Sequence, residues 1–188
     1  MKIGILGTGM VGNALGTKFT QLGHEVKMGS RSANNENAVA WVKSAARNAA
    51  QGTFAEAARF GEVAFICLKG ATFLELAKSL DAALFAGKVL VDVSNPLNFS
   101  ADGTLSLSIC NTNSLGEEVQ KALPSAKVVK TLNTVNCDVM VDPARGGAPT
   151  MLLCGNDSEA KKKVTALLKA MGWADIIDLG DITKIARN

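Results

Sequence analysis

The sequence predicts an α/β fold of the Rossmann type, a doubly wound and mostly parallel sheet with helices on both faces. Apolar segments typical of buried strands alternate with segments of helical periodicity along the whole chain. A glycine-rich turn, Gly7-Thr8-Gly9-Met10-Val11-Gly12, joins the first of these strands to the first helix. Alternation of this kind places helices on both faces of a parallel sheet. We therefore expect a single domain over residues 1–188, with residues 150–188 as a C-terminal strand–helix–strand extension.

The expected strands are short runs rich in branched apolar residues. Lys2–Leu6 opens the chain, and Val63–Leu68 is a continuous apolar run, which is typical of a strand buried on both faces. The remaining strands are expected at Glu25–Met28, Val89–Val93, Val128–Thr131, Met151–Cys154 and Ile176–Leu179.

The expected helices are marked by signals at their ends. The first spans Met10–Leu22 before Gly23, a residue suited to a C-terminal cap, and the second spans Asn35–Arg47. A Ser or Thr followed three residues later by Glu forms a capping box. Such boxes predict helix starts at Thr53 with Glu56, Thr72 with Glu75, and Ser114 with Glu117. The helix after Thr72 is expected to end near Leu84, and the last helix spans Ser158–Met171.

Each glycine of the first turn has a distinct expected role. Gly7 makes the tight turn, Gly9 lets a pyrophosphate approach the backbone, and Gly12 lets the helix pack close to the strand. The first-turn N–H groups and the helix dipole then face the phosphates. This strand–turn–helix context predicts a dinucleotide-binding site at Gly7, Thr8, Gly9, Met10, Val11 and Gly12.

The end of the second strand indicates which dinucleotide binds. An enzyme that uses NAD usually places Asp or Glu there, on the ribose 2′-hydroxyl. Here Gly29 leaves room and Ser30, Arg31 and Ser32 offer hydroxyl and guanidinium donors, an environment suited to a 2′-phosphate. The alternative is an ordinary polar loop with a solvated arginine. We interpret the segment as an NADP(H) site.

Ligands of such sheets bind beyond the carboxyl ends of the strands. The segments that follow later strands should therefore line the same crevice, with adenosine toward Arg31 and nicotinamide toward the later strands. Candidate cofactor-binding residues there are Leu68, Lys69, Ser94, Asn95, Pro96, Asn133 and Thr134. Of these, Ser94, Asn95, Asn133 and Thr134 are candidates for positioning the reacting ring. Turn chemistry alone is an equal explanation for Asn95-Pro96.

Composition excludes several other classes of function. A net charge of +3 is too small to indicate nucleic acid, and Lys161-Lys162-Lys163 is expected on a solvated helix face. Apolar runs stay below the roughly 18 residues of a membrane span. The first strand begins at once, so we expect no signal peptide and a cytoplasmic location. Four cysteines without metal-ligand spacing predict free thiols and no metal site.

An ordered set of motifs resembles the bacterial branch of the F420-dependent NADP oxidoreductase family. It comprises the glycine turn, Leu22–Val26, Gly29–Ser32, Asp92–Leu97, Val129–Thr134, Cys154–Asp157 and Ile177–Ile182. The cytoplasmic domain of the STEAP metalloreductases, which passes hydride from NADPH to a flavin, is similar. The resemblance implies direct hydride transfer between the nicotinamide and a stacked deazaflavin, with no covalent catalysis and no committed acid–base side chain.

The resemblance also implies which acceptors and which alternative functions are expected. Family members usually continue into an apolar helical tail that contributes to a homodimer and to the acceptor pocket, and we expect that tail to be absent here. The small-molecule acceptor is then F420, or a flavin if the chain is a flavin or ferric reductase of the STEAP type. A non-catalytic NADP(H)-binding sensor is the alternative of another class.

Overall fold

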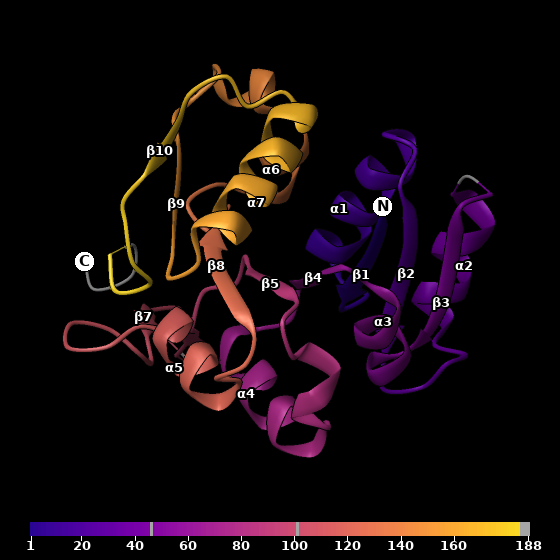
Figure 1. Cartoon of the computed structure of the whole chain (residues 1–188), viewed down its shortest axis with the longest axis horizontal. Helices are drawn as coiled ribbons and strands as arrows, with labels where there is room; N and C mark the ends of the chain where they lie inside the picture. The colour runs from indigo at the N-terminus through magenta and orange to yellow at the C-terminus, as the bar shows by residue number, and fades with distance from the viewer. Residues whose placement is uncertain (46, 101, 185–188) are drawn as a thin grey trace.

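The computed structural model describes residues 1–45, 47–100 and 102–184 and confirms the expected fold class. Within these residues an eight-stranded sheet runs in the order β10-β9-β8-β5-β4-β1-β2-β3 (Figure 1). Its strands are β1 (Lys2–Leu6), β2 (Glu25–Ser30), β3 (Ala49–Thr53), β4 (Val63–Ile66), β5 (Val89–Asp92), β8 (Lys127–Thr131), β9 (Met151–Gly155) and β10 (Ile176–Asp178).

The strand directions create the switch point of a doubly wound sheet. From β1 the chain builds β2 and β3 on one side, then returns to place β4 parallel to the other side of β1. β5 and β8 continue outward in parallel. β9 pairs antiparallel with β8, and β10 runs parallel to β9. The carboxyl ends of β1 and β4 therefore diverge into loops at one edge, where ligands of such sheets bind.

Helices cover both faces of the sheet. One apolar core contains side chains of α1 (Met10–Gln21), α2 (Glu36–Ser44), α6 (Cys137–Val141) and α7 (Ser158–Met171). A further core on the other face contains side chains of α3 (Phe54–Phe60), α4 (Gly70–Ser79), the 3-10 turn η1 (Ala82–Phe85) and α5 (Leu115–Ala122). Strand residues alternate between the two: Val91 packs in the first core and Leu90 in the second. This alternation explains the near-continuous apolar sequence of the central strands.

One expected helix start is wrong. Thr53 and Glu56 do form a capping box at α3, and Ser114 caps α5 through Glu117 N–H. The pair Thr72 and Glu75 does not cap α4. That helix begins two residues earlier at Gly70 and ends at Ser79, before η1, rather than near Leu84. The Thr72 N–H instead donates to the Lys69 carbonyl at 2.9 Å, and Glu75 pairs with Lys78.

Several elements have no counterpart among the expected ones. β3 has the sequence Ala-Ala-Gln-Gly-Thr, which lacks the branched apolar residues of a strand and is held by its pairing with β2. Because β3 starts at Ala49, α2 ends at Ser44 rather than at Arg47; residue 46 lies outside the described part. The hairpin of β6 (Leu97–Phe99) and β7 (Leu105–Leu107) projects beside α5 (Figure 1). The 3-10 turn η2 (Pro143–Gly146) follows α6.

The two Thr–Glu pairs supply a matched test of helix capping. Thr53→Ala removes a hydroxyl that accepts from the Glu56 N–H at 3.2 Å, so we expect a loss of about 1 kcal/mol in the free energy of unfolding. Thr72→Ala replaces a residue inside a helix turn, so stability should stay the same or rise by at most about 0.5 kcal/mol. Urea denaturation measures both. Equal losses for the two variants would contradict the assigned helix boundaries.

Candidate functional site

The first turn folds as the glycine pattern predicts. Gly7 has a φ of +138°, and a Cβ there would lie 2.3 Å from the carbonyl oxygen of Cys67. The Gly7 N–H donates to the Gly29 carbonyl at 3.1 Å, which ties the end of β1 to β2. A Cβ on Gly12 would lie 2.2 Å from the Gly7 carbonyl oxygen. Only glycine at these positions lets α1 begin directly above the end of β1.

Gly9 differs from its two neighbours in the turn. It is the N-cap of α1, offers no side-chain cap, and has an extended backbone with φ −79° and ψ −172°. A Cβ there would meet nothing within 4 Å. The space beside Gly9 is therefore open, and the unpaired first-turn N–H groups of the twelve-residue α1 face it. An anion is the ligand that such an N-terminus favours.

The end of β2 is more crowded than expected. A Cβ on Gly29 would lie 2.7 Å from the Cβ of Ala57, so this glycine is needed for the packing of α3 rather than for ligand room. Ser30 is buried, and its hydroxyl donates to the Ser32 carbonyl, which closes the loop. Arg31 and Ser32 are exposed. The guanidinium of Arg31 is thus the charged donor on this rim that solvent or a ligand can reach.

A cavity of about 510 Å³ lies at the switch point, between the glycine turn and the ends of β4, β5 and β8. Eight of the predicted site residues line it: Gly9, Met10, Val11, Leu68, Lys69, Ser94, Asn95 and Asn133. Its other lining residues are mostly apolar and were not among the predicted ones: Ile66, Cys67, Val93, Leu97, Val135, Asn136, Cys137 and Met140. Most of its wall is therefore suited to an apolar ring.

The other predicted site residues lie outside this cavity. Thr8 lines an adjoining hollow of about 750 Å³ between α1 and α2, which shares Gly9, Met10 and Cys137 with the cavity. Thr134 is exposed, and Pro96 is buried next to Asn95. Gly7 and Gly12 act through backbone packing. The α6 wall was not predicted from the sequence, although Asn136 shows the signal of an N-cap: its Oδ1 accepts from the Asp138 and Val139 N–H groups.

An amide pair forms the polar corner of the cavity. The Nδ2 of Asn95 donates to the Asn133 carbonyl at 2.8 Å, and the Nδ2 of Asn133 donates to Asn95 Oδ1 at 3.2 Å. Among the described residues, Asn133 Oδ1 is a buried side-chain oxygen without a hydrogen-bond partner. Such an atom is costly unless a ligand supplies a donor. A primary carboxamide, like that of nicotinamide, carries the required N–H group.

The backbone that carries Asn133 is strained. Leu132, directly before it, has a φ of +64°, which branched side chains rarely adopt, and its side chain is fully buried. Its N–H donates to the Met151 sulfur at 3.3 Å, the contact that holds this conformation. Strain of this kind persists where the surrounding structure enforces it, and it is common at ligand sites.

A buried ion pair beneath the cavity was missed by sequence reasoning. The Nζ of Lys130 lies 3.0 Å from Asp92 Oδ2, with the side chains 2% and 0% exposed. The two residues face each other across β5 and β8. The signal in the sequence was a charged residue at or near the carboxyl end of each of two strands, after a run of buried apolar residues: Asp92 in Val-Leu-Val-Asp and Lys130 in Lys-Val-Val-Lys-Thr. Charges in such positions are rarely fully buried unless they are paired.

The thiol of Cys67 is an unsuitable nucleophile. Although part of this residue is exposed toward the cavity, desolvation raises the pKa of its thiol well above the ordinary value, and the nearby Asp92 charge adds to the effect. A thiol with so high a pKa stays protonated at neutral pH, whereas the thiolate is the reactive form. The site therefore offers positioning rather than covalent chemistry.

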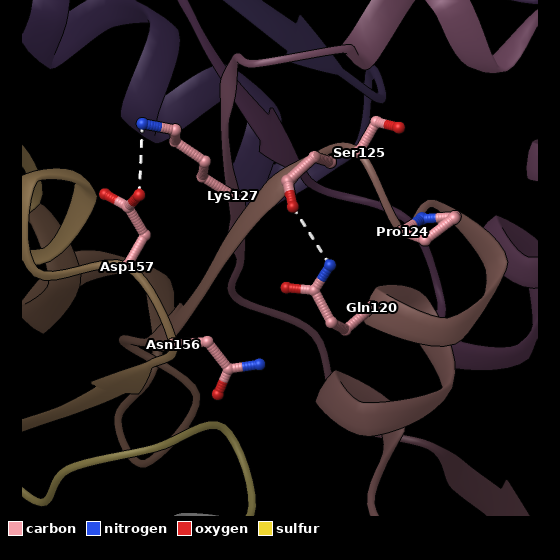
Figure 2. A pocket seen from close by; sticks show the side chains of 7 residues that line it. Gln120, Pro124, Ser125, Lys127, Asn156 and Asp157 are labelled. Atoms are coloured by element: carbon pink, nitrogen blue, oxygen red, sulfur yellow. Dashed lines mark hydrogen bonds and ion pairs between the residues drawn. The ribbon is translucent and has the colours of Figure 1, made fainter.

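A separate hollow of about 420 Å³ lies at the opposite end of β8, and Figure 2 shows the side chains that line it. Its polar groups bind one another: Lys127 pairs with Asp157 at 3.0 Å, and Gln120 Nε2 donates to the Ala126 carbonyl at 2.9 Å. Asn156 Oδ1 accepts from the Ile182 N–H at 3.1 Å. These contacts join α5, β8, β9 and the C-terminal segment, so the hollow is a junction of elements.

Two further kinds of feature are absent from the described ranges. No group of three or more His, Cys, Asp or Glu side chains there is arranged to hold a metal ion. No helix in the same ranges has both the length and the apolar character needed to cross a bilayer. The cysteines of the described ranges, Cys67, Cys110, Cys137 and Cys154, form no disulfide bond.

Known proteins resemble this chain over most of its length. The family described as "NADP oxidoreductase coenzyme F420-dependent" matches residues 2–96. Metalloreductase STEAP3 of Rattus norvegicus is 32% identical over 182 residues, which are 96% of this chain and 34% of that protein. The F420-dependent NADP reductase of Methanocaldococcus jannaschii is 32% identical over 130 residues, 69% of this chain and 58% of that protein. The chain thus spans well under two thirds of both curated relatives.

Solved structures agree with these sequence matches. A proposed F420-dependent NADP-reductase from Arthrobacter sp. FB24 is 42% identical, with a TM-score of 0.89 and coverage of 97% of this chain and 86% of its own. A reductive aminase from Aspergillus terreus, at 19% identity and a TM-score of 0.72, shares the fold; the match covers 98% of this chain and 57% of the aminase. The chain belongs to the family of coenzyme F420-dependent NADP oxidoreductases.

Proposed function

We propose that this chain transfers hydride between NADP(H) and a planar acceptor, with coenzyme F420 as the first candidate. The observation that carries the proposal is the cavity at the switch point, which lies between the open glycine turn and the Asn95–Asn133 pair. One end of this site offers N–H donors, and the other offers an amide oxygen to which residues 1–45, 47–100 and 102–184 supply no hydrogen-bond partner. Phosphate oxygens and a carboxamide N–H need those two environments.

The dinucleotide is held by backbone and by one charge. The N-terminus of α1 faces the pyrophosphate beside Gly9, where no side chain intervenes. The exposed Arg31 binds the 2′-phosphate through charge-assisted hydrogen bonds. The nicotinamide occupies the cavity near Ser94, Asn95 and Asn133. Bound NADPH supplies the hydride from C4 of its ring.

The remaining side chains of the cavity keep water away from the reacting rings. Met10 is 80% exposed and Leu97 is 41% exposed, although both are apolar and line the cavity. A planar acceptor stacked on the nicotinamide covers such surface, which stabilises the complex by about 25 cal/mol for each Å² removed from water. Alignment of two rings at close range supplies much of the catalysis in reactions of this class.

A flavin is the second candidate acceptor. The chain is 32% identical to metalloreductase STEAP3 over 96% of its own length, which favours this alternative. Sequence and cavity support both acceptors, since both have planar tricyclic rings. A cytoplasmic location and a homodimer stay predictions.

Oxidation of NADPH by the purified chain distinguishes these functions. We expect absorbance at 340 nm to fall fastest with F420, and comparable or faster turnover with FMN or FAD would favour the flavin reductase. NADPH binding without turnover on any acceptor would support the sensor and contradict the proposal.

Arg31→Ala tests the choice of cofactor. We expect NADPH affinity to fall by about 1.5–3 kcal/mol, the size of a hydrogen bond to a charged group, while NADH affinity stays nearly unchanged. Fluorescence titration measures both, with Arg59→Ala on the exposed face of α3 as the matched control. Equal losses for NADPH and NADH would show that Arg31 does not contact the 2′-phosphate.

Gly9→Val should abolish dinucleotide binding without loss of stability, whereas Gly12→Val should lower the stability of the fold. A Cβ at Gly9 meets nothing within 4 Å, so thermal stability should be kept in Gly9→Val while binding of both dinucleotides is lost. Valine at Gly12 collides with the Gly7 carbonyl and should destabilise the fold by several kcal/mol, of the order known for overpacked positions. Thermal denaturation and NADPH titration check the pair. Normal NADPH affinity in Gly9→Val would refute the placement of the pyrophosphate.

A further inference from the structure

We propose that the buried Asp92–Lys130 pair sets the hydrogen-bond polarity of Ser94, making its hydroxyl oxygen an acceptor for the carboxamide N–H of nicotinamide. This inference rests on the proposed function, because it assigns a specific contact within the same site. Asp92 and Lys130 are positioning residues in this account, and Ser94 is the residue that contacts the cofactor.

The ion pair holds Ser94 at three points. The Ser94 hydroxyl donates to Asp92 Oδ1 at 2.6 Å, and its backbone N–H donates to the same oxygen at 3.0 Å. The Ser94 carbonyl accepts from the Nζ of Lys130. The backbone and side chain of Ser94 are thus bound to two neighbouring charges, which are held on adjacent strands by the sheet register.

These contacts determine which further hydrogen bonds the Ser94 hydroxyl can form with a ligand. A serine hydroxyl has one proton and two acceptor lone pairs, and an ionised carboxylate has no proton to give. The proton of Ser94 is therefore directed to Asp92, and its oxygen faces other partners only as an acceptor. Ser94 is 7% exposed and lines the cavity, and in the proposed complex the ligand contacts that oxygen.

Ser94 thereby offers an acceptor to the cavity, as does Asn133 after the neighbouring strand β8. Asn133 Oδ1 is also an acceptor, and it has no partner among the described residues. Ser94 lies two residues after the end of β5, and Asn133 lies two residues after the end of its paired strand β8. Both residues line the same cavity. The cavity therefore presents two acceptors, the complement of an amide NH₂ group, which has two protons to donate.

Stability alone does not explain why the Asp92–Lys130 ion pair is buried here. Buried ion pairs stabilise folds no more than well-packed apolar residues of similar volume, because desolvation offsets the attraction between the charges. A carboxylate, however, accepts at both of its oxygens: Oδ1 of Asp92 accepts from the hydroxyl and the N–H of Ser94, and Oδ2 accepts from Lys130, whereas an amide can accept at only one of these two positions. Lys130 in turn compensates the buried charge of that carboxylate.

The test compares NADP⁺ with its 3-acetylpyridine analogue, which keeps the carbonyl but replaces the amide NH₂ with a methyl group. Dissociation constants are measured by calorimetric titration of the purified chain, without any acceptor. The wild-type chain should prefer NADP⁺. Ser94→Ala should lower NADP⁺ affinity about fivefold, the value of one neutral hydrogen bond, and leave affinity for the analogue unchanged.

Asp92→Asn tests the role of the ion pair. An amide can donate as well as accept, so the polarity of Ser94 is no longer set and the preference for NADP⁺ should fall by a similar factor. The double variant Asp92→Asn/Lys130→Met, which leaves no unpaired charge buried, is the substitute if the single variant does not fold. Asp157→Asn is the matched control, since it removes an ion pair with Lys127 at the far end of β8.

The ratio of the two dissociation constants separates positioning from a structural role. A variant that only weakens the fold lowers the affinities for NADP⁺ and for the analogue together and leaves their ratio unchanged. That result for Ser94→Ala would overturn the inference. NADP⁺ binding by the wild-type chain would still support the proposed function. Failure of the wild-type chain to bind NADP⁺ would instead overturn both. A reduced ratio in Ser94→Ala and Asp92→Asn, but not in Asp157→Asn, confirms the inference.

Discussion

The close approach of α1 to the end of β1 is the constraint on which the site depends. A Cβ at Gly7 or Gly12 would lie within 2.3 Å of a backbone oxygen, so both positions require glycine. This packing brings the first-turn N–H groups of α1 to the edge of the sheet where the paired strands β1 and β4 end. The location of the cavity then follows from the strand order, because the switch point lies between these two strands.

The site separates two kinds of hydrogen-bonding group along its length. Donors gather at the turn and at the end of β2, where the α1 terminus and Arg31 lie. Acceptors gather at the ends of β5 and β8, where Asn133 Oδ1 has no partner in the described part of the chain and the Ser94 proton is directed to Asp92. In NADP(H) the 2′-phosphate and the carboxamide lie on opposite halves of the molecule with the pyrophosphate between them, so this separation would also orient such a ligand.

Much of the fold could be predicted from local sequence. The central strands are apolar on both faces, and Thr53 and Ser114 carry true capping signals. The failures have physical causes: β3 is a strand through pairing with β2 rather than through its own residues, and Thr72 carries a capping pattern inside a helix that already started at Gly70. Of the site, the glycine turn and the ends of the strands were predictable. The α6 wall, the strained Leu132 and the Asp92–Lys130 pair depend on contacts between distant segments, so they could not be read from spacing.

A crystal structure of the chain with NADP⁺ tests the central claim most directly. We expect the pyrophosphate to lie against Gly9 and the carboxamide nitrogen to lie about 3 Å from both Ser94 Oγ and Asn133 Oδ1. We also expect contact between the 2′-phosphate and Arg31. A nicotinamide bound outside the cavity, or a carboxamide with its carbonyl oxygen turned toward Ser94 and Asn133, would contradict the central claim.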